Sequence, residues 1–446
     1  MIFKTKTGNC YDKAIFYIKA LFTTEKSHRN IEKMTDGYSK LDYFKIQHFI
    51  SESPWSAKNA MADAAKDINE LFAGRKHVAL VIDESGEEKK GTESVGVSPQ
   101  YCGNLGKICN SQVAVYATLV ADNLVSIIDT RLYLPKKWTD NPEKCKAAGI
   151  PEADQVFKTK TELALDIITS QKKAGIRFDW INADGLYGND LNLLAALEEE
   201  DELYVIDIHS DKKIYLEIFE LKVKEKISNK GKVPSQLLPN KTGIKANKYI
   251  ENLDDKDWQK VFLRDGAKGI LEVETYNKTV YILDKDNKCS RKLLIVSRKK
   301  NSKKEYEYKY AFSNAQDNTF TFQELAYMQC HRFWVEQAFR DAKQSLGMTD
   351  YQIRGWLAWH HHMALVMMAM VFSIREKIRH KEDVPLLSIS DIRLLIINKF
   401  AKTSVSKLPI EQQIKIRHIE RQKDIDYRYI RNQKNEQFQV SPNLSK

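Results

Sequence analysis

The chain has 446 residues, of which 42% are hydrophobic and 10% aromatic. This composition is typical of globular proteins and excludes a largely disordered chain, and the length suffices for about two or three domains. Lysine and arginine number 71 against 60 acidic residues, and the resulting formal charge of +11 favours a polyanionic partner.

The chain opens with helical patterns, and we expect residues 1–74 to form a helical DNA-binding region. The stretch "KIQHFISESPWSAKNAMADAAKDINELF" holds an apolar-periodic segment, a break at Ser53-Pro54 and a second helix capped near Ser56. Two short helices joined by a turn can dock on a DNA groove. The pattern alone does not establish helix-turn-helix geometry.

The period then changes to that of buried strands. "HVALVIDES", from His77 to Ser85, is a continuous apolar run that ends on acids. Two further strands, "SQVAVYATLVA" and "LVSIIDTRLYLP", are separated by Asp122-Asn123, a tight-turn dipeptide. Together the three segments predict an antiparallel meander.

Helices and strands alternate after the meander. "TELALDIITSQKKAG" predicts a helix stopped by Gly175, "FDWINADG" a strand ending at Asp184, "NDLNLLAALEEE" a helix and "ELYVIDIH" a strand. The order β-β-β-α-β-α-β is that of the ribonuclease H-like fold, an α/β fold with a mixed five-stranded sheet and flanking helices. We assign the first part of this core to residues 75–214.

Two aspartates stand at strand ends in this scheme. In such a sheet the first strand and the end of the fourth are neighbours, so we expect Asp83 and Asp184 to lie close together. One acid at a strand end usually marks only a boundary. Two acids at neighbouring strand ends indicate a site, because a carboxylate there needs solvent, a cation or a metal.

The sequence departs from the core pattern over residues 215–320. Short β-like segments, "GILEVETY", "TVYILD" and "KLLIVS", alternate there with the lysine-rich runs "KVKEKISNKGKVP" and "SRKKNSKKEYEYKY", which predicts a β-rich insertion. Residues 321–378 return to the core. Their apolar run "MALVMMAMVF" is about half the length that crosses a bilayer, so we expect a buried helix and no membrane partner. Residues 379–446 form a basic, helical C-terminal region.

The stretch "HRFWVEQAFRDAKQSLGM", His331 to Met348, predicts an amphipathic helix with two rows. The apolar row consists of Val335, Phe339, Ala342 and Leu346, and the polar row of Arg332, Glu336, Arg340 and Lys343. Taken alone, this is a surface helix with ion pairs. Placed against the sheet edge, Glu336 becomes a third carboxylate beside the two aspartates.

Three carboxylates suit phosphoryl transfer with two divalent metal ions. Mg²⁺, with Mn²⁺ as a substitute, prefers oxygen ligands and needs neither His nor Cys. Arg332, Arg340 and Lys343 on the same side of the helix suit a DNA phosphate backbone. The Gly-rich loop from Glu87 to Ile108 offers three more candidate DNA contacts: Lys89, Lys90 and Lys107.

Other candidates have simpler explanations. Glu84 and Asp207 are spare acids that face away from the strand-end aspartates, and His360, His361 and His362 point about 100° apart on a helix. Cys102 and Cys109 lack zinc spacing. Aromatic residues in hairpins usually pack, although a flipped base could stack on one of Trp258, Tyr276 and Tyr281. The six scattered cysteines and the lack of a signal-peptide pattern favour the cytoplasm, with nucleoid association.

Several blocks resemble bacterial insertion-sequence transposases of the DDE class, in the group with a Tyr-Arg-Glu-Lys signature. These are "VIDESGEEKKGTESVGVSPQYCGNLGKICNSQVAV", "NADGLYG" and "RFWVEQAFRDAKQSLGMTDYQIRGWLAWHHH". The resemblance implies that Asp83, Asp184 and Glu336 are the metal-binding catalytic triad and that Arg332 and Lys343 are the signature's basic positions. The tyrosine position holds Gln329, with Tyr327 the nearest tyrosine.

The expected function is cut-and-paste transposition, with metal-dependent cleavage at element ends and strand transfer into a target. The partners would be double-stranded DNA, both terminal inverted repeats and target, and a second copy of the chain in a homodimeric synaptic complex. Two alternatives stay open: a domesticated DNA-binding protein that no longer cleaves, and a ribonuclease H-like nuclease or resolvase.

Overall fold

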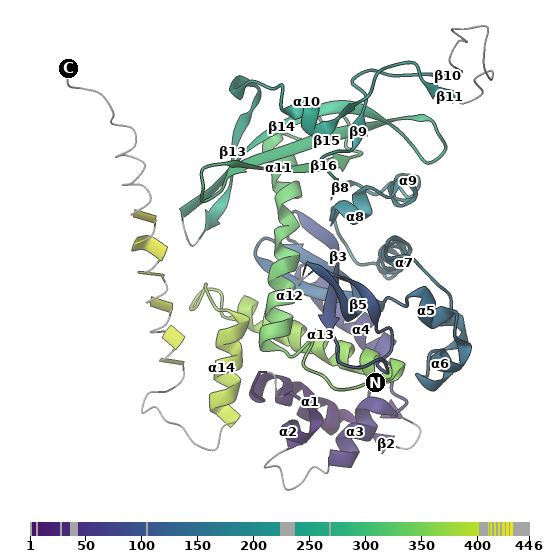
Figure 1. Cartoon of the computed structure of the whole chain (residues 1–446). Helices are drawn as coiled ribbons and strands as arrows, with labels where there is room; N and C mark the ends of the chain where they lie inside the picture. Colours follow the sequence, from purple (N-terminus) through teal and green to yellow (C-terminus); the bar gives the residue numbers. More distant parts are fainter. Residues whose placement is uncertain are drawn as a thin grey trace. The chain divides into compact units, whose positions relative to one another are not determined.

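The computed structural model describes residues 2–5, 8–26, 29–35, 43–103, 106–223, 237–266, 269–400 and part of 409–430. The chain folds into two compact units. The first is Met1–Phe178 with Phe333–Asp424, and the second is Asp179–Arg332 with Ile425–Lys446. The elements are labelled in Figure 1.

The first unit combines an antiparallel sheet with helices. Its strands are β1 (Lys4–Thr5), β2 (Gly8–Asn9), β3 (Val78–Glu88), β4 (Ser98–Cys102), β5 (Lys107–Ala121) and β6 (Leu124–Leu132). Its helices are α1 (Tyr11–Thr23), α2 (Ile31–Thr35), α3 (Tyr43–Ser51), α4 (Ala57–Leu71), α5 (Lys136–Thr139), α6 (Pro142–Ala147), α7 (Lys160–Lys173), α12 (Phe333–Ser345), α13 (Trp356–Arg379) and α14 (Ile389–Phe400).

The predicted meander is confirmed. β5 pairs antiparallel with β3, β4 and β6, and Asp122 adopts a φ of 56° in the tight turn between β5 and β6. The expected loop from Glu87 to Ile108 is wrong in part, because Ser98–Cys102 forms β4 and pairs with the start of β5. Main-chain pairing with β5 therefore orders a stretch whose glycines suggested only a turn.

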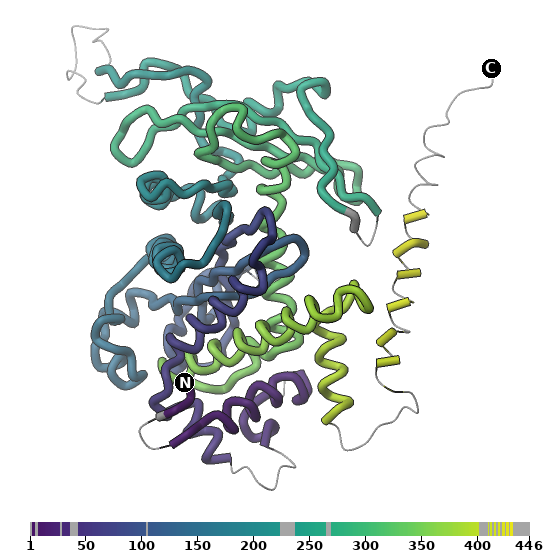
Figure 2. Tube along the Cα trace, turned by 180° about the vertical axis from the view of Figure 1, so that it is seen from behind, coloured from purple at the N-terminus to yellow at the C-terminus, as the bar shows by residue number. Residues whose placement is uncertain are grey.

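α13 is the central helix of the first unit. It packs against α1, α3, α4, α14 and β6, and Figure 2 shows α1 to α4 gathered beside it. By length and composition it could cross a membrane, but 78% of its most apolar window is buried inside the protein. It is therefore the buried core helix that the sequence predicted.

The helices α3 and α4 form as expected, with Ser56 capping α4 by accepting a hydrogen bond from the Asn59 amide. Alanines along α4 let it pack closely on α13. The ring nitrogens of His361 lie 2.8 and 2.9 Å from the carbonyl oxygens of Ile50 and Trp55, which join the two helices. DNA binding by this region stays a prediction.

The second unit is built on a mixed sheet in the order β13-β14-β15-β16-β8-β7. Among the strand pairs that the structure describes in this sheet, β7 with β8 is the parallel one. Its strands are β7 (Trp180–Ala183), β8 (Tyr204–Asp207), β9 (Lys213–Ile214), β10 (Leu221–Val223), β11 (Leu237–Pro239), β12 (Ile244–Lys245), β13 (Gln259–Gly266), β14 (Gly269–Leu283), β15 (Cys289–Lys300) and β16 (Tyr306–Ser313). Its helices are α8 (Gly185–Gly188), α9 (Leu191–Glu199), α10 (Ala246–Ile250) and α11 (Phe322–His331).

Residues 215–320 are rich in strands, as predicted, but two of the strands expected there are one. "GILEVETY" and "TVYILD" both belong to β14, which continues through Asn277 and Lys278. These polar residues pair with Ile295 and Leu294 of β15, so the ladder is uninterrupted. Most of the run "KVKEKISNKGKVP" lies outside the described residues.

The expected helix from His331 to Met348 is divided in the structure. α11 ends at His331, Arg332 is its C-terminal cap, and α12 begins at Phe333. The boundary between the two units falls at the same place. Arg332 and Glu336 therefore belong to different helices.

The α/β class, with a large mixed sheet and helices, is confirmed. The chain order β3, β5, β6, α7, β7, α9, β8 is the predicted one, with β4 added. In the basic C-terminal region α14 is helical, and residues 401–408 and 431–446 lie outside the described residues.

Candidate metal centre and DNA-binding residues

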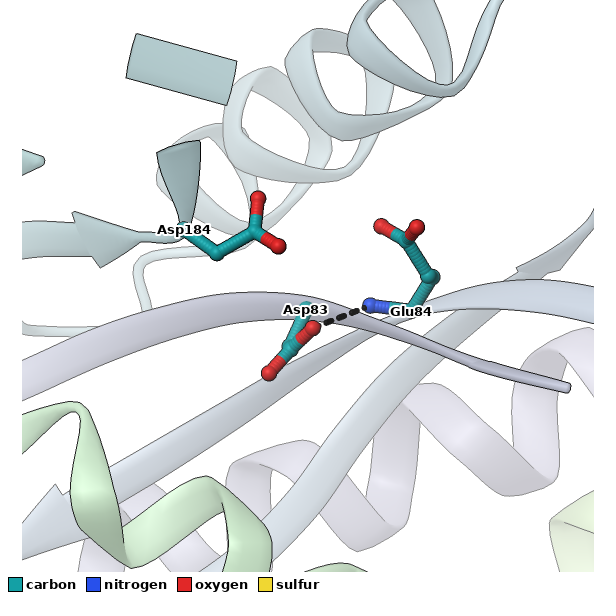
Figure 3. A group of neighbouring side chains, drawn as sticks. All are labelled: Asp83, Glu84 and Asp184. Carbon is teal, nitrogen blue, oxygen red and sulfur yellow. Dashed lines mark hydrogen bonds between the residues drawn. The ribbon is translucent and has the colours of Figure 1, made fainter. Parts of the chain in front are cut away.

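The predicted strand end at Asp83 is wrong, because β3 continues through Asp83 to Glu88 in its ladder with β5. Asp83 directly follows the fully apolar stretch of β3. Leu80, Val81 and Ile82 are buried, whereas Asp83 is half-buried. Its carboxylate accepts a 2.8 Å hydrogen bond from the main-chain amide of Glu84, drawn in Figure 3. An acid at this point of a buried strand has no value for the core, so its position indicates a functional role.

Glu84 leaves β3 in the opposite direction from Asp83, as neighbouring residues of a strand do (Figure 3). Its carboxylate lies 2.8 Å from Lys160 Nζ in the first turn of α7. This ion pair ties α7 to β3. Glu84 thus has a structural partner, but the expectation that it lies apart from the site is wrong, because one of its carboxylate oxygens is within 4.8 Å of an Asp83 carboxylate oxygen.

Asp184 follows β7 in the second unit, and Figure 3 shows its side chain at that strand end. Its carboxylate caps α8 by accepting a 2.9 Å hydrogen bond from the Leu186 amide. A Cβ on Gly188 would lie 1.9 Å from the carbonyl oxygen of Asp207, so this glycine lets α8 approach β8 closely. Close packing of α8 fixes the position of Asp184.

Asp207 ends β8 and accepts from Arg332 Nε at 3.1 Å. Burial raises the pKa of the Asp207 carboxyl, and nearby Asp184 raises it further, while Arg332 and Lys309 lower it. Asp207 and Asp184 therefore lie close together at one edge of the second unit's sheet. The Arg332 side chain is engaged within the protein, and its DNA contact stays a prediction.

Glu336 is exposed in the first turn of α12. Contacts within the first unit show which face of the sheet this helix covers. Phe339, one turn later, contacts Tyr116 edge to face with ring centroids 5.3 Å apart. Tyr116 pairs directly with Asp83, so both side chains leave the same face of the sheet. α12 therefore lies on the Asp83 face. Figure 3 labels Asp83, Glu84 and Asp184, the acids that could hold a metal ion among the residues that the structure describes. Glu336 does not belong to this set of three.

Lys343, two turns after Glu336 on α12, also lies against the Asp83 face of the sheet. It interacts with Glu87, which alternates onto the Asp83 face of β3. Burial lowers the pKa of Lys343, while Glu87 raises it. The apolar row packs as predicted, with Val335, Ala342 and Leu346 buried and Phe339 half-buried.

The lysines of the β3–β5 connection differ in exposure. Lys89 Nζ lies 3.9 Å from the centre of the Tyr351 ring, and burial lowers its pKa. Lys90 and Lys107 are exposed, as is Arg340 on α12. The side chains of Lys89 and Lys343 thus have neighbours inside the first unit that the sequence did not indicate, while Lys90, Lys107 and Arg340 face solvent.

Gln329, at the signature's tyrosine position, is buried in the second unit. Its side-chain oxygen accepts from the Ser297 hydroxyl on β15. Nearby, Tyr327 packs against Trp180 and His331. The glutamine therefore joins α11 to the sheet.

The aromatic residues of the insertion pack on one another. Trp258 and Tyr276 have ring centroids 6.2 Å apart, and the Arg298 guanidinium lies 4.3 Å above the Trp258 ring. Tyr281 exchanges main-chain hydrogen bonds with Tyr215. Stacking of a flipped base on any of them stays a prediction.

The sequence did not reveal the contacts that hold these elements in place. Arg29 is fully buried and pairs with Asp350 at 2.7 Å, joining the N-terminal helices to the segment after α12. The Glu87–Lys343 contact could have been anticipated from the alternation of Asp83, Ser85 and Glu87 along β3. The Arg29–Asp350 pair left no pattern, because its members are 321 residues apart.

Residues 11–270 match the family model described as DDE superfamily endonuclease. The chain belongs to this family. It is 25% identical over 319 residues, 69% of this chain and 68% of the relative, to a protein of Microchaete diplosiphon described as a probable transposase for insertion sequence element IS701.

A solved structure of a piggyBac transposase synaptic complex with hairpin DNA is also similar. The match covers 90% of this chain and 75% of that chain, at 12% identity and a TM-score of 0.39. The expected membership in the insertion-sequence DDE transposases is confirmed by the family and the sequence relative. The Tyr-Arg-Glu-Lys signature is not confirmed, and Glu336 lies beyond the matched residues.

Proposed function

We propose that the chain is the DNA transposase of an insertion sequence, which cleaves DNA at the element ends and joins them to target DNA by cut and paste. The observation that carries this proposal is the arrangement around Asp83. Asp83 lies within β3, directly after its buried apolar stretch and inside the matched residues, and the helix that bears Glu336 lies on the Asp83 face of the sheet. The name of the IS701 relative supports the same function.

The catalytic core would be ribonuclease H-like. The chain order of β3, β5, β6, α7, β7, α9 and β8 supports this assignment, and β9 to β16 would be the insertion. In that fold the strands of Asp83 and Asp184 are neighbours. We therefore propose Asp83, Asp184 and Glu336 as the catalytic carboxylates.

The proposed ligands fit two Mg²⁺ ions, or Mn²⁺ in their place. The donor set is made of carboxylate oxygens, which hard divalent ions prefer. Asp83 and Asp184 each cap one main-chain amide, and a carboxylate offers about four lone-pair sites, so capping is compatible with coordination. Bound ions would lower the pKa of the attacking hydroxyl and neutralise the charge that develops on phosphate oxygens.

We assign three roles to the side chains around the site: orienting the metal ligands, contacting DNA and positioning other groups. Asp83 and Asp184 are held by β3 and by the cap of α8, so they would orient their ligand oxygens with little motion. Arg340, Lys90 and Lys107 are exposed and would contact DNA phosphates. The protein neighbours of Lys89, Lys343 and Arg332 favour positioning roles for these three cations.

The reaction would consist of successive in-line displacements at phosphorus. Water would first release a 3′ hydroxyl at an element end, and that hydroxyl would then attack the opposite strand or the target. Because two ends must be held together, the working complex would contain at least two copies of the chain. DNA-bound copies would be found in the cytoplasm with the nucleoid.

The test is cleavage of a plasmid that carries the coding region with its flanking DNA. We expect nicking with Mg²⁺ or Mn²⁺, none in EDTA, and DNA binding with little cutting in Ca²⁺. Cleavage that persists in EDTA contradicts the mechanism. Binding without cleavage in any metal supports a domesticated DNA-binding protein, and nicking without strand transfer supports a nuclease or resolvase.

A further inference from the structure

Three cations gather on one face of the second unit's sheet, the face covered by α11. The hydrogen bond from Ser297 to Gln329 identifies this face on β15. Lys309 pairs directly with Ser297, so its side chain leaves the same face, and Lys299 follows Ser297 by two residues along β15. We call Arg264, Lys299 and Lys309 the α11-side cations.

Cys330, in the last turn of α11, marks the point where they converge. Burial raises the pKa of its thiol to about 11, and Lys309, Arg264 and Lys299 each act on it in the opposite direction. Three cations from β13, β15 and β16 are thus close enough to one side chain to influence its ionisation. Arg264 also interacts with Tyr327 on the same helix.

The acids near this cluster leave it with a positive charge. Asp207 interacts with Lys309, and its carboxylate is bound by Arg332. Glu307, opposite Lys299, accepts a hydrogen bond from Asn301. Lys299 and Lys309 are both exposed, and neither forms an ion pair with any residue that the structure describes.

The cluster adjoins the proposed catalytic edge of its own unit. Lys309 and Asp184 both act on the Asp207 carboxyl, so the cations begin beside the strand end that carries Asp184. From there they extend outward over β16 and β15. Diagonal neighbours in a sheet are about 7–8 Å apart, a spacing that lets two lysines contact separate phosphates of one strand.

We infer that Lys299 and Lys309, with Arg264 behind them, bind the phosphate backbone of the DNA strand that passes Asp184. The contact is to phosphate oxygens and is independent of base sequence. This inference rests on the proposed function for its DNA substrate. It assigns to the insertion a direct part in holding the strand beside the catalytic carboxylates.

The test compares two double variants of the full chain. Lys299→Gln with Lys309→Gln removes the two exposed cations. Lys278→Gln with Lys303→Gln removes the same charge from β14 and from the β15–β16 turn. Lys278 pairs with Leu294 and therefore leaves the face opposite α11. All four side chains are exposed, so folding should be unaffected.

Affinity for a fixed 30-base-pair duplex would be measured in Ca²⁺ at several salt concentrations. Each lost phosphate contact lowers the slope of log affinity against log salt by about 0.9, so the first variant should lose about 1.8 and the second nothing. Lys299→Arg with Lys309→Arg should keep the wild-type slope. An unchanged slope in the first variant, or an equal loss in the control pair, overturns the inference.

Because this assay needs no cleavage, its result is separable from the plasmid test of function. A selective loss of slope in a protein that does not cut DNA supports the cation surface and refutes the transposase mechanism. A wild-type slope in the first variant of a protein that cleaves with Mg²⁺ does the reverse.

Discussion

Replacing Asp350 with asparagine tests how firmly the segment after α12 is anchored. Arg29 Nη1 lies 2.7 Å from Asp350 Oδ2, and Nη2 donates to the carbonyl oxygens of Gln344 and Ser345 at 3.1 and 3.3 Å. The Arg29 side chain is 0% exposed and that of Asp350 12%. The asparagine would therefore leave a buried guanidinium without its counterion.

The expected loss of stability follows from this burial. Removing one partner of a buried ion pair costs about 3–5 kcal/mol. The two carbonyl partners of Arg29 persist in the variant, so we expect the lower end, about 3 kcal/mol. For a unit of this size that lowers Tm by about 6–12 °C.

Asp67→Asn provides a matched control. Asp67 pairs with Arg375 at 3.2 Å, but the two side chains are 47% and 55% exposed. Exposed pairs contribute about 0–1 kcal/mol, so its Tm should fall by no more than about 4 °C. Thermal unfolding of the wild type and both variants would be followed by circular dichroism. Equal shifts for Asp350→Asn and Asp67→Asn would refute the reasoning from burial.

Glu336→Gln should keep the fold and DNA binding but reduce plasmid nicking by orders of magnitude, and near wild-type nicking would exclude Glu336 as a metal ligand. Leu346→Gln, at a fully buried position, should instead lower Tm because it buries an unpaired amide. Gly188→Ala should lower the free energy of unfolding by about 1–3 kcal/mol in urea, because the new Cβ would lie 1.9 Å from the Asp207 carbonyl oxygen. Gly149→Ala is the control: the space around it is open, so only the strain of its φ of 72° should lower stability. Burial raises the pKa of the Glu87 carboxyl above its ordinary 4.5, so the folded state loses stability as pH rises from 4.5 through the raised pKa. Glu87→Gln should therefore gain stability relative to wild type as pH rises above 4.5, and a difference in unfolding free energy that does not change with pH would contradict the shift.

Much of the fold could be predicted because its strands are apolar runs with marked ends. β3, β5 and β6 follow from such runs and from the Asp122 turn, and the acids within β3 and after β7 stand out against their apolar neighbours. β14 was divided in the prediction because Asn277 and Lys278 look like a turn. Only the pairing with β15 shows that they lie within a strand.

The candidate site was predicted less completely, because a charged residue's partner is rarely near in sequence. Lys89 and Lys343 carry charges that suit DNA, but Tyr351 and Glu87 occupy their surroundings in the folded unit. Lys299 and Lys309 were seen only as part of lysine-rich runs. Strand register was needed to place them on one face.

Arg332, at the break between α11 and α12, anchors the end of α11. The φ and ψ of this residue, −53° and −31°, are helical, and Phe333 opens the next helix without any linker. Its guanidinium is bound to Asp207 at the end of β8. The ion pair therefore ties the C-terminal cap of α11, the residue directly before α12, to the end of β8 within the second unit.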